Sequence, residues 1–426
     1  MKRVGVAILG LGTVGGGTYR ILTDHREFYR KTQDIDLEVE CVLELNKDRI
    51  AALGIPDEKV AANIAEIVSD PDVNIVIEVI GGVGVARSFV QAALNAGKSV
   101  VTSNKELIAK YSYELEDIAR RKNCGLYYEA SCVGGVPIIR SLLDGLQANR
   151  IVSMMGIVNG TTNYILDKMT NEGASYGDVL KQAQQLGYAE LDPTADVEGY
   201  DSTYKLSILA SMAFHTKIPY TEIYREGITG ITQEDIAYGK ELGYVIKLLA
   251  IGKNTPAGIE ARVHPAYVRA THPLASVNDA FNAVYITGDA VDDVMLYGRG
   301  AGDLPTGSAI VSDVIYASTH SDVKYSTFKN TAKADKDTKF VTNFSSAYYL
   351  RMTVEDRVGV LSRVSNIFAK HGVSICEMIQ KDGKEEGLAS LIFITHETKE
   401  ESIQKAVRKI GDLSDVRNVD SVIRVV

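Results

Sequence analysis

VGVAILGLGTVG, residues 4–15, places an unbroken apolar run immediately before a turn that contains three glycines. A short apolar run is typical of a buried strand, and Gly-x-Gly-x-x-Gly between a strand and a helix is the dinucleotide-binding fingerprint. The first glycine permits the tight turn, the second lets the backbone approach a pyrophosphate, and the third lets the helix pack closely on the strand. The predicted cofactor loop consists of Gly10, Leu11, Gly12, Thr13, Val14 and Gly15.

The sequence on both sides of this loop alternates between strand and helix patterns. Continuous apolar strands separated by helices indicate a parallel sheet with helices on both faces. Residues 1–130 are therefore predicted to form an α/β, Rossmann-type dinucleotide-binding domain. Strands are expected at residues 3–9, 37–45, 73–80, 99–102 and 126–129, and helices at residues 15–23, 63–69, 85–96 and 105–122.

A different pattern follows the first domain. Longer helices alternate with amphipathic strands such as residues 259–270 and 283–288, which predicts a separate α+β domain over residues 131–299. A glycine-rich stretch, GRGAGDLPTGS at residues 298–308, then precedes an apolar helix at residues 309–316.

The last part of the chain has the order β-α-β-β-α-β, which is that of the ferredoxin-like fold. A polar, lysine-rich segment at residues 321–339 precedes it and is a linker by composition. We therefore expect a linker over residues 319–346 and a C-terminal domain over residues 347–426. Its strands are expected at residues 348–354, 373–379, 389–395 and 416–425, and its helices at residues 360–370 and 399–410.

The bulk properties exclude several classes of protein. A chain of 426 residues is too long for one core, and a net charge of −9 without a basic tract argues against binding nucleic acid. No apolar run reaches the roughly 18 residues of a membrane span, and Met1 leads almost directly into a strand, so we expect no signal peptide and a cytoplasmic location. The four cysteines are scattered without C-x-x-C spacing, which predicts a reduced compartment and no zinc site.

An acidic stretch, LGYAELDPTADVEGYDSTYK at residues 186–205, holds five carboxylates and one lysine in its last sixteen residues. Asp201 and Lys205 are four residues apart, which places them on one face of a helix in the favourable order. A solvated helix start with one surface ion pair would explain that spacing. The apolar LSILASMAF that follows, residues 206–214, instead predicts a buried helix. A lysine that faces a carboxylate at the start of a buried helix is a candidate proton donor or acceptor.

A second lysine, Lys105, follows the strand that ends at Thr102. Ser103 and Glu106 have the spacing of a capping box, so Ser103 is the expected N-cap and Lys105 lies in the first turn of the helix. A cation there opposes the helix dipole, which would lower the pKa of its ammonium group. Lys105 is either a solvated lysine or a cation directed at a ligand from the carboxyl edge of the sheet, where ligands bind in such folds.

The end of the second strand determines which nicotinamide cofactor fits. A carboxylate there accepts a hydrogen bond from a free 2′-hydroxyl and repels a 2′-phosphate, so Glu44 slightly favours NAD over NADP. Lys47 and Arg49 follow closely and would hold a 2′-phosphate if Glu44 pointed away.

Together these segments resemble the homoserine dehydrogenase family over nearly the whole chain, and the C-terminal part resembles an ACT domain, an amino-acid sensor. Several segments are specific to the family rather than generic. Besides the glycine loop and the acidic stretch they are TSNKELIA (residues 102–109), YEASCVGGVPII (128–139), NGTTNYIL (159–166) and GRGAGDLPTGSA (298–309).

The resemblance implies reversible hydride transfer from NAD or NADP between aspartate 4-semialdehyde and L-homoserine, in threonine, methionine and isoleucine biosynthesis. An aldehyde oxygen gains negative charge as hydride arrives, and a lysine can supply both a positive charge and a proton to it. By position, the family's catalytic lysines fall on Lys205 and Lys105. Its substrate-binding residues fall on Glu190, Asp196, Asp201, Lys205, Gly160 and Thr162, and its cofactor contacts beyond the glycine loop on Glu44, Ser103, Lys105 and Gly307.

The resemblance also implies a structural sodium ion, an effector site and an oligomer. Residues 131–299 would bind the substrate and form a dimer, and residues 300–318 would return to the first domain. Since ferredoxin-like domains expose sheet edges that commonly pair, we expect a homodimer or homotetramer. The sodium segment falls on Glu129, Cys132, Gly134 and Val136, and the effector segment, for threonine, on Asp356, Val358, Gly359 and Val360.

Two other functions remain open from the sequence. Cys132 could be the nucleophile of an aldehyde dehydrogenase that acts on the same semialdehyde, but no histidine lies within twenty residues of it to act as a base. A buried cysteine more often acts as a small hydrophobic residue. The chain could also be a catalytically silent amino-acid sensor, against which the intact lysine pair argues.

Overall fold

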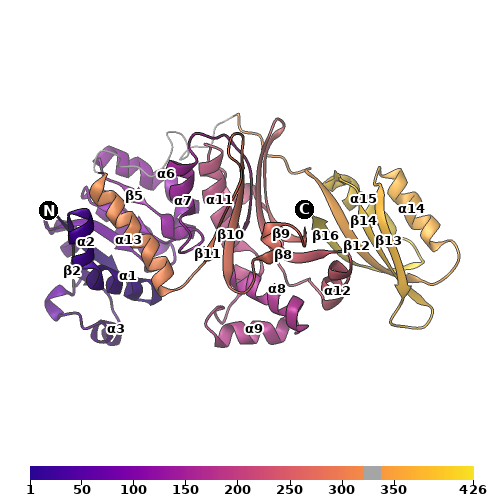
Figure 1. The fold of residues 1–426 in the computed structure, drawn as a ribbon, viewed down its shortest axis with the longest axis horizontal. Helices are drawn as coiled ribbons and strands as arrows, with labels where there is room; N and C mark the ends of the chain where they lie inside the picture. Colours follow the sequence, from indigo (N-terminus) through magenta and orange to yellow (C-terminus); the bar gives the residue numbers. More distant parts are fainter. Residues whose placement is uncertain (321–336) are drawn as a thin grey trace.

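The computed structural model describes residues 1–320 and 337–426 and shows three parts arranged in a row (Figure 1). The N-terminal part is a parallel sheet of five strands in the order β2-β1-β3-β4-β5, which confirms the predicted Rossmann-type fold. Its elements are β1 (Lys2–Leu9), α1 (Thr13–Asp24), α2 (Arg26–Gln33), β2 (Ile35–Leu43), α3 (Lys47–Ala52), α4 (Ile64–Ser69), β3 (Val73–Glu78), α5 (Gly84–Asn95), β4 (Ser99–Thr102), α6 (Lys105–Lys122) and β5 (Leu126–Tyr127).

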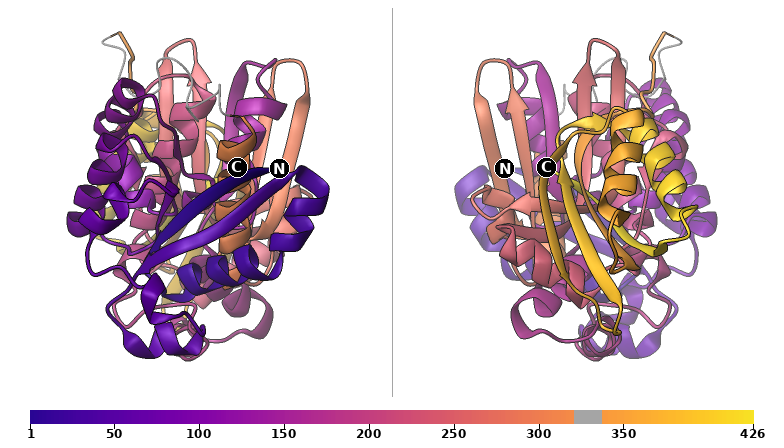
Figure 2. Two further views of the ribbon diagram at one scale, coloured as in Figure 1. Left: turned by 90° about the vertical axis from the view of Figure 1, so that its left-hand side faces the viewer. Right: turned by 90° about the vertical axis from the view of Figure 1, so that its right-hand side faces the viewer.

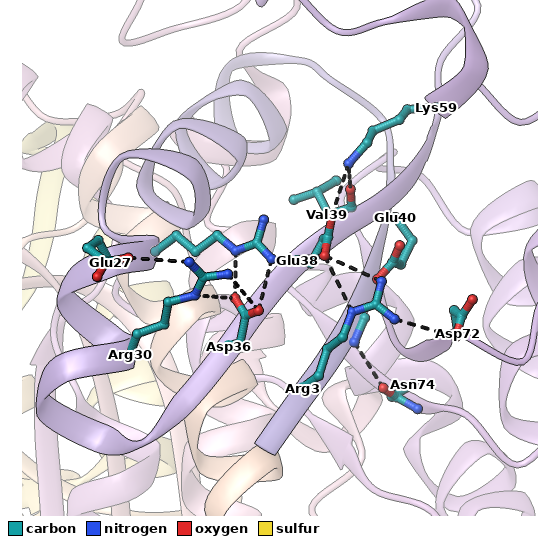
Figure 3. A network of polar contacts seen from close by, with 12 residues as sticks. Arg3, Glu27, Arg30, Asp36, Glu38, Val39, Glu40, Lys59, Asp72 and Asn74 are labelled. Atoms are coloured by element: carbon teal, nitrogen blue, oxygen red, sulfur yellow. Dashed lines mark hydrogen bonds and ion pairs between the residues drawn. The ribbon is translucent and has the colours of Figure 1, made fainter. Parts of the chain in front are cut away.

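Helix α2 was not predicted from hydrophobic periodicity, because charge holds it in place. Arg26 and Arg30 on this helix both donate to the carboxylate of Asp36 near the start of β2. Arg3 on β1 donates to Glu38 on β2, and Figure 3 shows these groups as one polar network. The network lies at the amino ends of the strands, opposite the carboxyl edge at which ligands bind in such sheets.

Helix α13 (Asp303–Thr319) packs along α1 in the N-terminal part, so the chain crosses back after the middle part (Figure 1). The expected helix at residues 309–316 lies within α13, which begins six residues earlier, in the glycine-rich stretch. Glycines let the two helices approach closely. A Cβ atom at Gly17 would lie 2.3 Å from the carbonyl oxygen of Asp303, and one at Gly307 would lie 3.0 Å from the amide nitrogen of Thr18.

The middle and C-terminal parts share one sheet of eleven strands, in the order β11-β10-β6-β8-β9-β16-β12-β14-β13, with β7 beside β9 and β15 beside β12. The middle part contributes β6 (Ile151–Ile157), β7 (Tyr224–Arg225), β8 (Tyr244–Thr255), β9 (Gly258–Arg269), β10 (Phe281–Gly288) and β11 (Asp292–Arg299). Its helices are α7 (Ile138–Arg140), α8 (Gly160–Glu172), α9 (Tyr176–Gln185), α10 (Thr194–Val197), α11 (Tyr200–Ala213) and α12 (Gln233–Glu241).

The C-terminal part has the predicted ferredoxin-like order, with both main helices on one face of its strands (Figure 2). The predicted linker lies largely at residues 321–336, outside the described residues, and the domain limits stay a prediction. No helix in the described residues is long and apolar enough to cross a membrane. The elements are β12 (Ser345–Glu355), α14 (Val360–Lys370), β13 (Ile375–Asp382), β14 (Leu388–Thr395), β15 (Thr398–Lys399), α15 (Glu400–Gly411) and β16 (Val416–Val425).

Candidate active site

The glycine loop has the geometry that its motif requires. Gly10 has a φ of +93°, a left-handed value that favours glycine. A Cβ atom at Gly15 would lie only 2.0 Å from the carbonyl oxygen of Gly10, so the helix can approach the strand only with glycine there. Gly12 is the N-cap of α1, and a Cβ atom on it would meet nothing nearer than the Arg49 side chain at 3.9 Å. The space above the helix N-terminus is therefore open to a phosphate group.

Glu44 supports this loop directly. One carboxylate oxygen accepts from the amide of Leu11 at 2.7 Å, and the other accepts from Leu45 and Asn46 at 2.8 and 2.9 Å. Burial alone would raise the pKa of Glu44, but these amides and the nearby Arg49 hold it below its ordinary value. Glu44 is thus an anion beside the expected ribose position. It also stabilises the glycine loop through its hydrogen bond with Leu11.

Lys105 begins α6, but the expected N-cap is wrong. The cap is Asn104, whose side-chain oxygen accepts from the amide of Leu107 at 3.1 Å, and not Ser103. Serine and asparagine cap helices about equally well, so the sequence did not distinguish between these neighbours. Glu106, the expected capping-box partner, forms an ion pair with Lys110 instead. Ser103 lies partly exposed at the carboxyl edge of the sheet.

The loop after β3, residues 79–83, belongs to the same edge and was missed in the sequence. Thr102 donates to the carboxylate of Glu78 at 2.7 Å, and the amide of Ile80 donates to that carboxylate at 2.9 Å. Asn104 donates to the carbonyl oxygen of Gly82 at 2.6 Å. These contacts tie the loop to the start of α6. A glycine pair directly after an apolar strand was the signal that could have revealed it.

Asp201 joins the two predicted catalytic lysines. One carboxylate oxygen lies 2.7 Å from Nζ of Lys205 and the other 3.1 Å from Nζ of Lys105. Lys205 also donates to the carbonyl oxygen of Val158 at 2.7 Å. Lys205 and Asp201 are buried on α11, whereas the side chain of Lys105 on α6 is 43% exposed. The site therefore forms where a helix of the N-terminal part meets a helix of the middle part.

The electrostatics of this cluster correct one expectation. Burial alone would raise the pKa of Asp201, but the ammonium groups of Lys205 and Lys105 hold it well below its ordinary value. The Asp201 carboxylate in turn raises the pKa of Lys105, where the helix dipole alone predicted a lowered value. A full negative charge at 3.1 Å outweighs the partial charge of the helix end. Lys105 is thus a stable cation at neutral pH.

Asn159, the first residue of the NGTT segment, connects that segment to the carboxylates of the site. Its Nδ2 donates to Asp201 at 2.8 Å and to Asp196 at 2.7 Å, and its Oδ1 accepts from the amide of Thr162 at 2.8 Å as the N-cap of α8. Thr162 is buried, and a Cβ atom at Gly160 would lie 2.8 Å from the carbonyl oxygen of Ala280. The NGTT segment therefore fixes the carboxylates through Asn159.

The other predicted acids lie at the edge of the cluster. Burial and the neighbouring Asp201 raise the pKa of Asp196, which is half-buried. Glu190 is exposed, and its charge contributes with that of Asp196 to the raised pKa of Lys105. The rim of the site is therefore negative around its two cations.

Cys132 cannot serve as a nucleophile in this arrangement. It is fully buried, and burial raises the pKa of its thiol to about 12. Its sulfur lies 3.9 Å from the carbonyl oxygen of Lys205. A thiol with that pKa is protonated at neutral pH, so an acyl-enzyme mechanism at Cys132 has no reactive thiolate.

The segment predicted to hold sodium contains a buried carboxylate, Glu129, whose negative charge is disfavoured by burial. Glu129 accepts from the amides of Ile139 and Arg140 at 2.8 and 2.6 Å, and burial followed by the nearby Asp313 raises its pKa to about 8. A cation at Glu129 would relieve this cost, so the residue fits the implied ion. No group of three or more His, Cys, Asp or Glu side chains in residues 1–320 and 337–426 could hold a metal, so any such ion needs backbone oxygens. The backbone candidates are Cys132, Gly134 and Val136.

The predicted effector residues lie at the turn between β12 and α14. Asp356 is exposed and accepts from the side chain of Gln380 at 3.3 Å, and Val358 is fully exposed. Gly359 has a φ of +92° and is the N-cap of α14. The side chain of Val360 is buried in the domain core, so Val360 can face a ligand only with its backbone.

Models of three protein families match the chain. They describe "Homoserine dehydrogenase, NAD binding domain" over residues 10–129, "Homoserine dehydrogenase" over residues 137–315 and "ACT domain" over residues 348–415.

Curated relatives and solved structures agree with these models. Homoserine dehydrogenase of Bacillus subtilis is 39% identical over 429 residues, covering 100% of this chain and 99% of the relative. The enzyme of Mycobacterium tuberculosis is 42% identical over 434 residues, covering 99% and 98%. The crystal structure of a homoserine dehydrogenase from Thiobacillus denitrificans has a TM-score of 0.94 at 39% identity, covering 100% of this chain and 99% of that one.

Proposed function

The chain belongs to the homoserine dehydrogenase family, and we propose that its Lys105–Asp201–Lys205 site reduces L-aspartate 4-semialdehyde reversibly to L-homoserine with a nicotinamide cofactor. One observation carries the proposal: two ammonium groups from different parts of the chain share a single buried carboxylate at the carboxyl edge of the cofactor sheet. The biosynthesis of threonine, methionine and isoleucine is the proposed context, in the cytoplasm.

The two lysines have different parts in the proposed reaction. A nicotinamide bound at the glycine loop supplies the hydride when the aldehyde is reduced. Lys205, buried and oriented by Asp201 and Val158, donates the proton to the aldehyde oxygen. Lys105, whose pKa is raised, keeps its charge and stabilises the developing alkoxide.

The acids of the site suit the other end of the substrate. Both substrate and product carry an ammonium group, which requires a carboxylate. The charges of Glu190 and Asp196 both act on Lys105, whereas Asp201 is occupied by the two lysines. We therefore assign the ammonium group to Glu190 and Asp196. Gly160 and Thr162 support the substrate site indirectly, because Thr162 donates to Asn159, which in turn donates to Asp196.

For the cofactor we propose a preference for NAD. Glu44 is held ionised beside Gly12, and an anion there repels a 2′-phosphate, although Arg49 lies 3.5 Å away and opposes this effect. A similar protein from a hyperthermophilic archaeon was solved in complex with NADPH at 28% identity and a TM-score of 0.63, over 74% of this chain. Neutralising Glu44→Gln should shift the ratio of kcat/KM toward NADP by roughly tenfold, about 1.4 kcal/mol. Arg49→Ala should shift it toward NAD.

Regulation, metal and assembly complete the proposal. Threonine binds at Asp356 and the backbone of the turn before α14, and it inhibits the enzyme. Glu129, with backbone oxygens of Cys132, Gly134 and Val136, holds a structural sodium ion. The chain works as a homodimer or homotetramer.

Steady-state kinetics test the proposed function. The oxidation of homoserine is followed at 340 nm with NAD and with NADP, in the presence and absence of threonine. Activity with homoserine but not with its analogue lacking the hydroxyl group, 2-aminobutyrate, is the expected result. A purified protein that turns over neither homoserine nor the semialdehyde with either cofactor would leave the sensor function as the better explanation.

A further inference from the structure

The loop that follows α11 is fastened to this helix close to Lys205. Ser207 donates to the carbonyl oxygen of Ile218 at 2.6 Å, and the amide of Ile218 donates to Ser211 at 2.9 Å. Both serines are buried, and they lie two and six residues after Lys205 on the same helix. The loop therefore moves with α11.

The same loop reaches across to α6 through one side chain. Nζ of Lys217 donates to the carbonyl oxygen of Ala109 at 3.1 Å and to the hydroxyl group of Ser112 at 2.9 Å. These acceptors lie four and seven residues after Lys105, in the first two turns of its helix. An unbroken series of contacts thus runs from Lys205 through the loop to Lys105, separate from Asp201.

The surroundings of Lys217 are those of a structural ammonium group. It lines a cavity of about 20 Å³, large enough for one water molecule, together with Glu116 of α6, Tyr128 and Ser211. Burial lowers the pKa of Lys217 to about 8, and the charge of Glu116 opposes this. Removing an ammonium group from water costs free energy, and here the hydrogen bonds to Ala109 and Ser112 offset that cost. These contacts therefore stabilise the packing of the two helices.

We propose that Lys217 is a positioning residue, which fixes α6 against α11 and so sets the place of Lys105 beside Asp201. This inference rests on the proposed function, in which Lys105 stabilises charge on the substrate. Lys105 is the first residue of α6, so a small tilt of the helix displaces it more than residues in the middle. A displacement of about 1 Å at a reacting centre can cost about 10²-fold in rate.

Lys217→Met tests the inference, because methionine keeps most of the volume and removes both hydrogen bonds to α6. We expect kcat to fall by roughly 10- to 100-fold, with KM for the cofactor unchanged, since the glycine loop is not touched. Lys98→Met is the matched control. Lys98 is a buried lysine that donates to two carbonyl oxygens, those of Asp70 and Val73, both at 2.6 Å, within the N-terminal part. It should lose stability but keep kcat.

A double-mutant cycle separates positioning from general damage. If Lys217 acts through Lys105, Lys217→Met should have less than a twofold effect on kcat in a Lys105→Ala background. An equal loss of kcat in both backgrounds would overturn the inference. If Lys217→Met fails to fold, Ser112→Ala gives the second reading, with an expected loss of roughly two- to fivefold that also vanishes in Lys105→Ala. Should Lys105→Ala itself retain full kcat, the proposed function of that lysine fails, and this outcome is distinct from a neutral Lys217→Met.

Discussion

Helices α6 and α11 meet through side chains, whereas the middle and C-terminal parts meet through the backbone of a shared sheet. We call the first contact the catalytic seam, defined by Lys105, Asp201, Lys205 and Lys217, and the second the regulatory seam, defined by Asp235, Arg351 and the pairing of β9 with β16. At the catalytic seam Lys105 is still 43% exposed. At the regulatory seam Asp235 is fully buried and the side chain of Arg351 is 7% exposed.

Backbone and side-chain hydrogen bonds both cross the regulatory seam. β16 pairs in parallel with β9, with Arg424 opposite Ala266. Arg351 on β12 donates from Nε to Asp235 at 2.9 Å, at the start of α12, and Tyr349 donates to the same carboxylate at 3.2 Å. An ACT-like domain attached in this way cannot rotate freely on a linker.

The difference suggests how each seam works. A contact made by side chains, one of them partly exposed, can admit a substrate without breaking backbone pairing, and its charges are available to the reaction. A contact made by backbone pairing and buried charges resists opening, so an effector must act by shifting packed elements together. In this chain α12 and β9 are elements of the middle part that contact the C-terminal part, so we expect any such shift to pass through them.

The largest effect is expected at the catalytic seam. Lys205→Ala should lower kcat by roughly 10²–10⁴-fold, the usual range for a lost general acid or base, with a smaller change in KM for homoserine. Lys205→Arg is the matched control, since it keeps the charge but cannot release the proton, and it should be nearly as slow. Stopped-flow and steady-state rates measure both. Retention of more than a tenth of the wild-type kcat would remove Lys205 from its proposed role.

At the regulatory seam we expect an effect on stability rather than on chemistry. Arg351→Met leaves the buried Asp235 without its cation, which should cost about 3–5 kcal/mol in the free energy of unfolding. Urea unfolding followed by circular dichroism measures it. Lys381→Met is the control, because Lys381 bridges the same two parts through an exposed pair with Glu241 and should cost at most about 1 kcal/mol. Equal costs would mean that the two seams do not differ in the proposed way.

The free energy that couples effector binding to activity should be smaller than the cost of losing Arg351. If threonine binds near Asp356, a coupling of about 1–3 kcal/mol would weaken activity some 5- to 150-fold at saturation, and homoserine or cofactor must weaken threonine binding by the same factor. Isothermal calorimetry and inhibition kinetics measure the two sides. Asp356→Asn should lose inhibition while keeping kcat, and serine serves as the control ligand. Absence of both binding and inhibition at millimolar threonine would exclude threonine as the effector.

If the linker alone joined the C-terminal part to the rest, a chain ending near Ser318 would keep activity and lose inhibition. The structure instead joins the two parts by strand pairing and buried charges. Removal of the C-terminal part would expose the edge of β9 and uncover Asp235 and Tyr267, both now buried. A truncated chain should therefore lose stability together with inhibition.

Local patterns in the sequence predicted the parts of the molecule that local physics determines. The glycine spacing at Gly10 to Gly15, the i,i+4 pair of Asp201 with Lys205 and the limits of α6 and α14 all depend on neighbouring residues. Contacts between distant segments carry no such local signal. The pairing of β16 with β9 and the link from Asn159 to Asp201 could be found only in the folded chain.

The smallest effect concerns the sodium ion proposed near the catalytic seam. The segment with Glu129 connects the N-terminal part to the middle part, and the carboxylate there is buried with a pKa raised to about 8. A sodium concentration ten times the dissociation constant stabilises the folded state by about 1.4 kcal/mol. This shifts Tm by a few degrees, about 2–4 °C per kcal/mol for a domain of average size.

The Tm at pH 8 in sodium chloride should therefore be higher than in choline chloride of equal ionic strength. Glu129→Gln should abolish the difference, while Asp144→Asn should preserve it, because Asp144 is an exposed carboxylate in the π-helical turn Ser141–Gly145 after α7. If the wild-type Tm is the same in both salts, the segment holds no sodium, and its carboxylate serves only to receive the amides of Ile139 and Arg140.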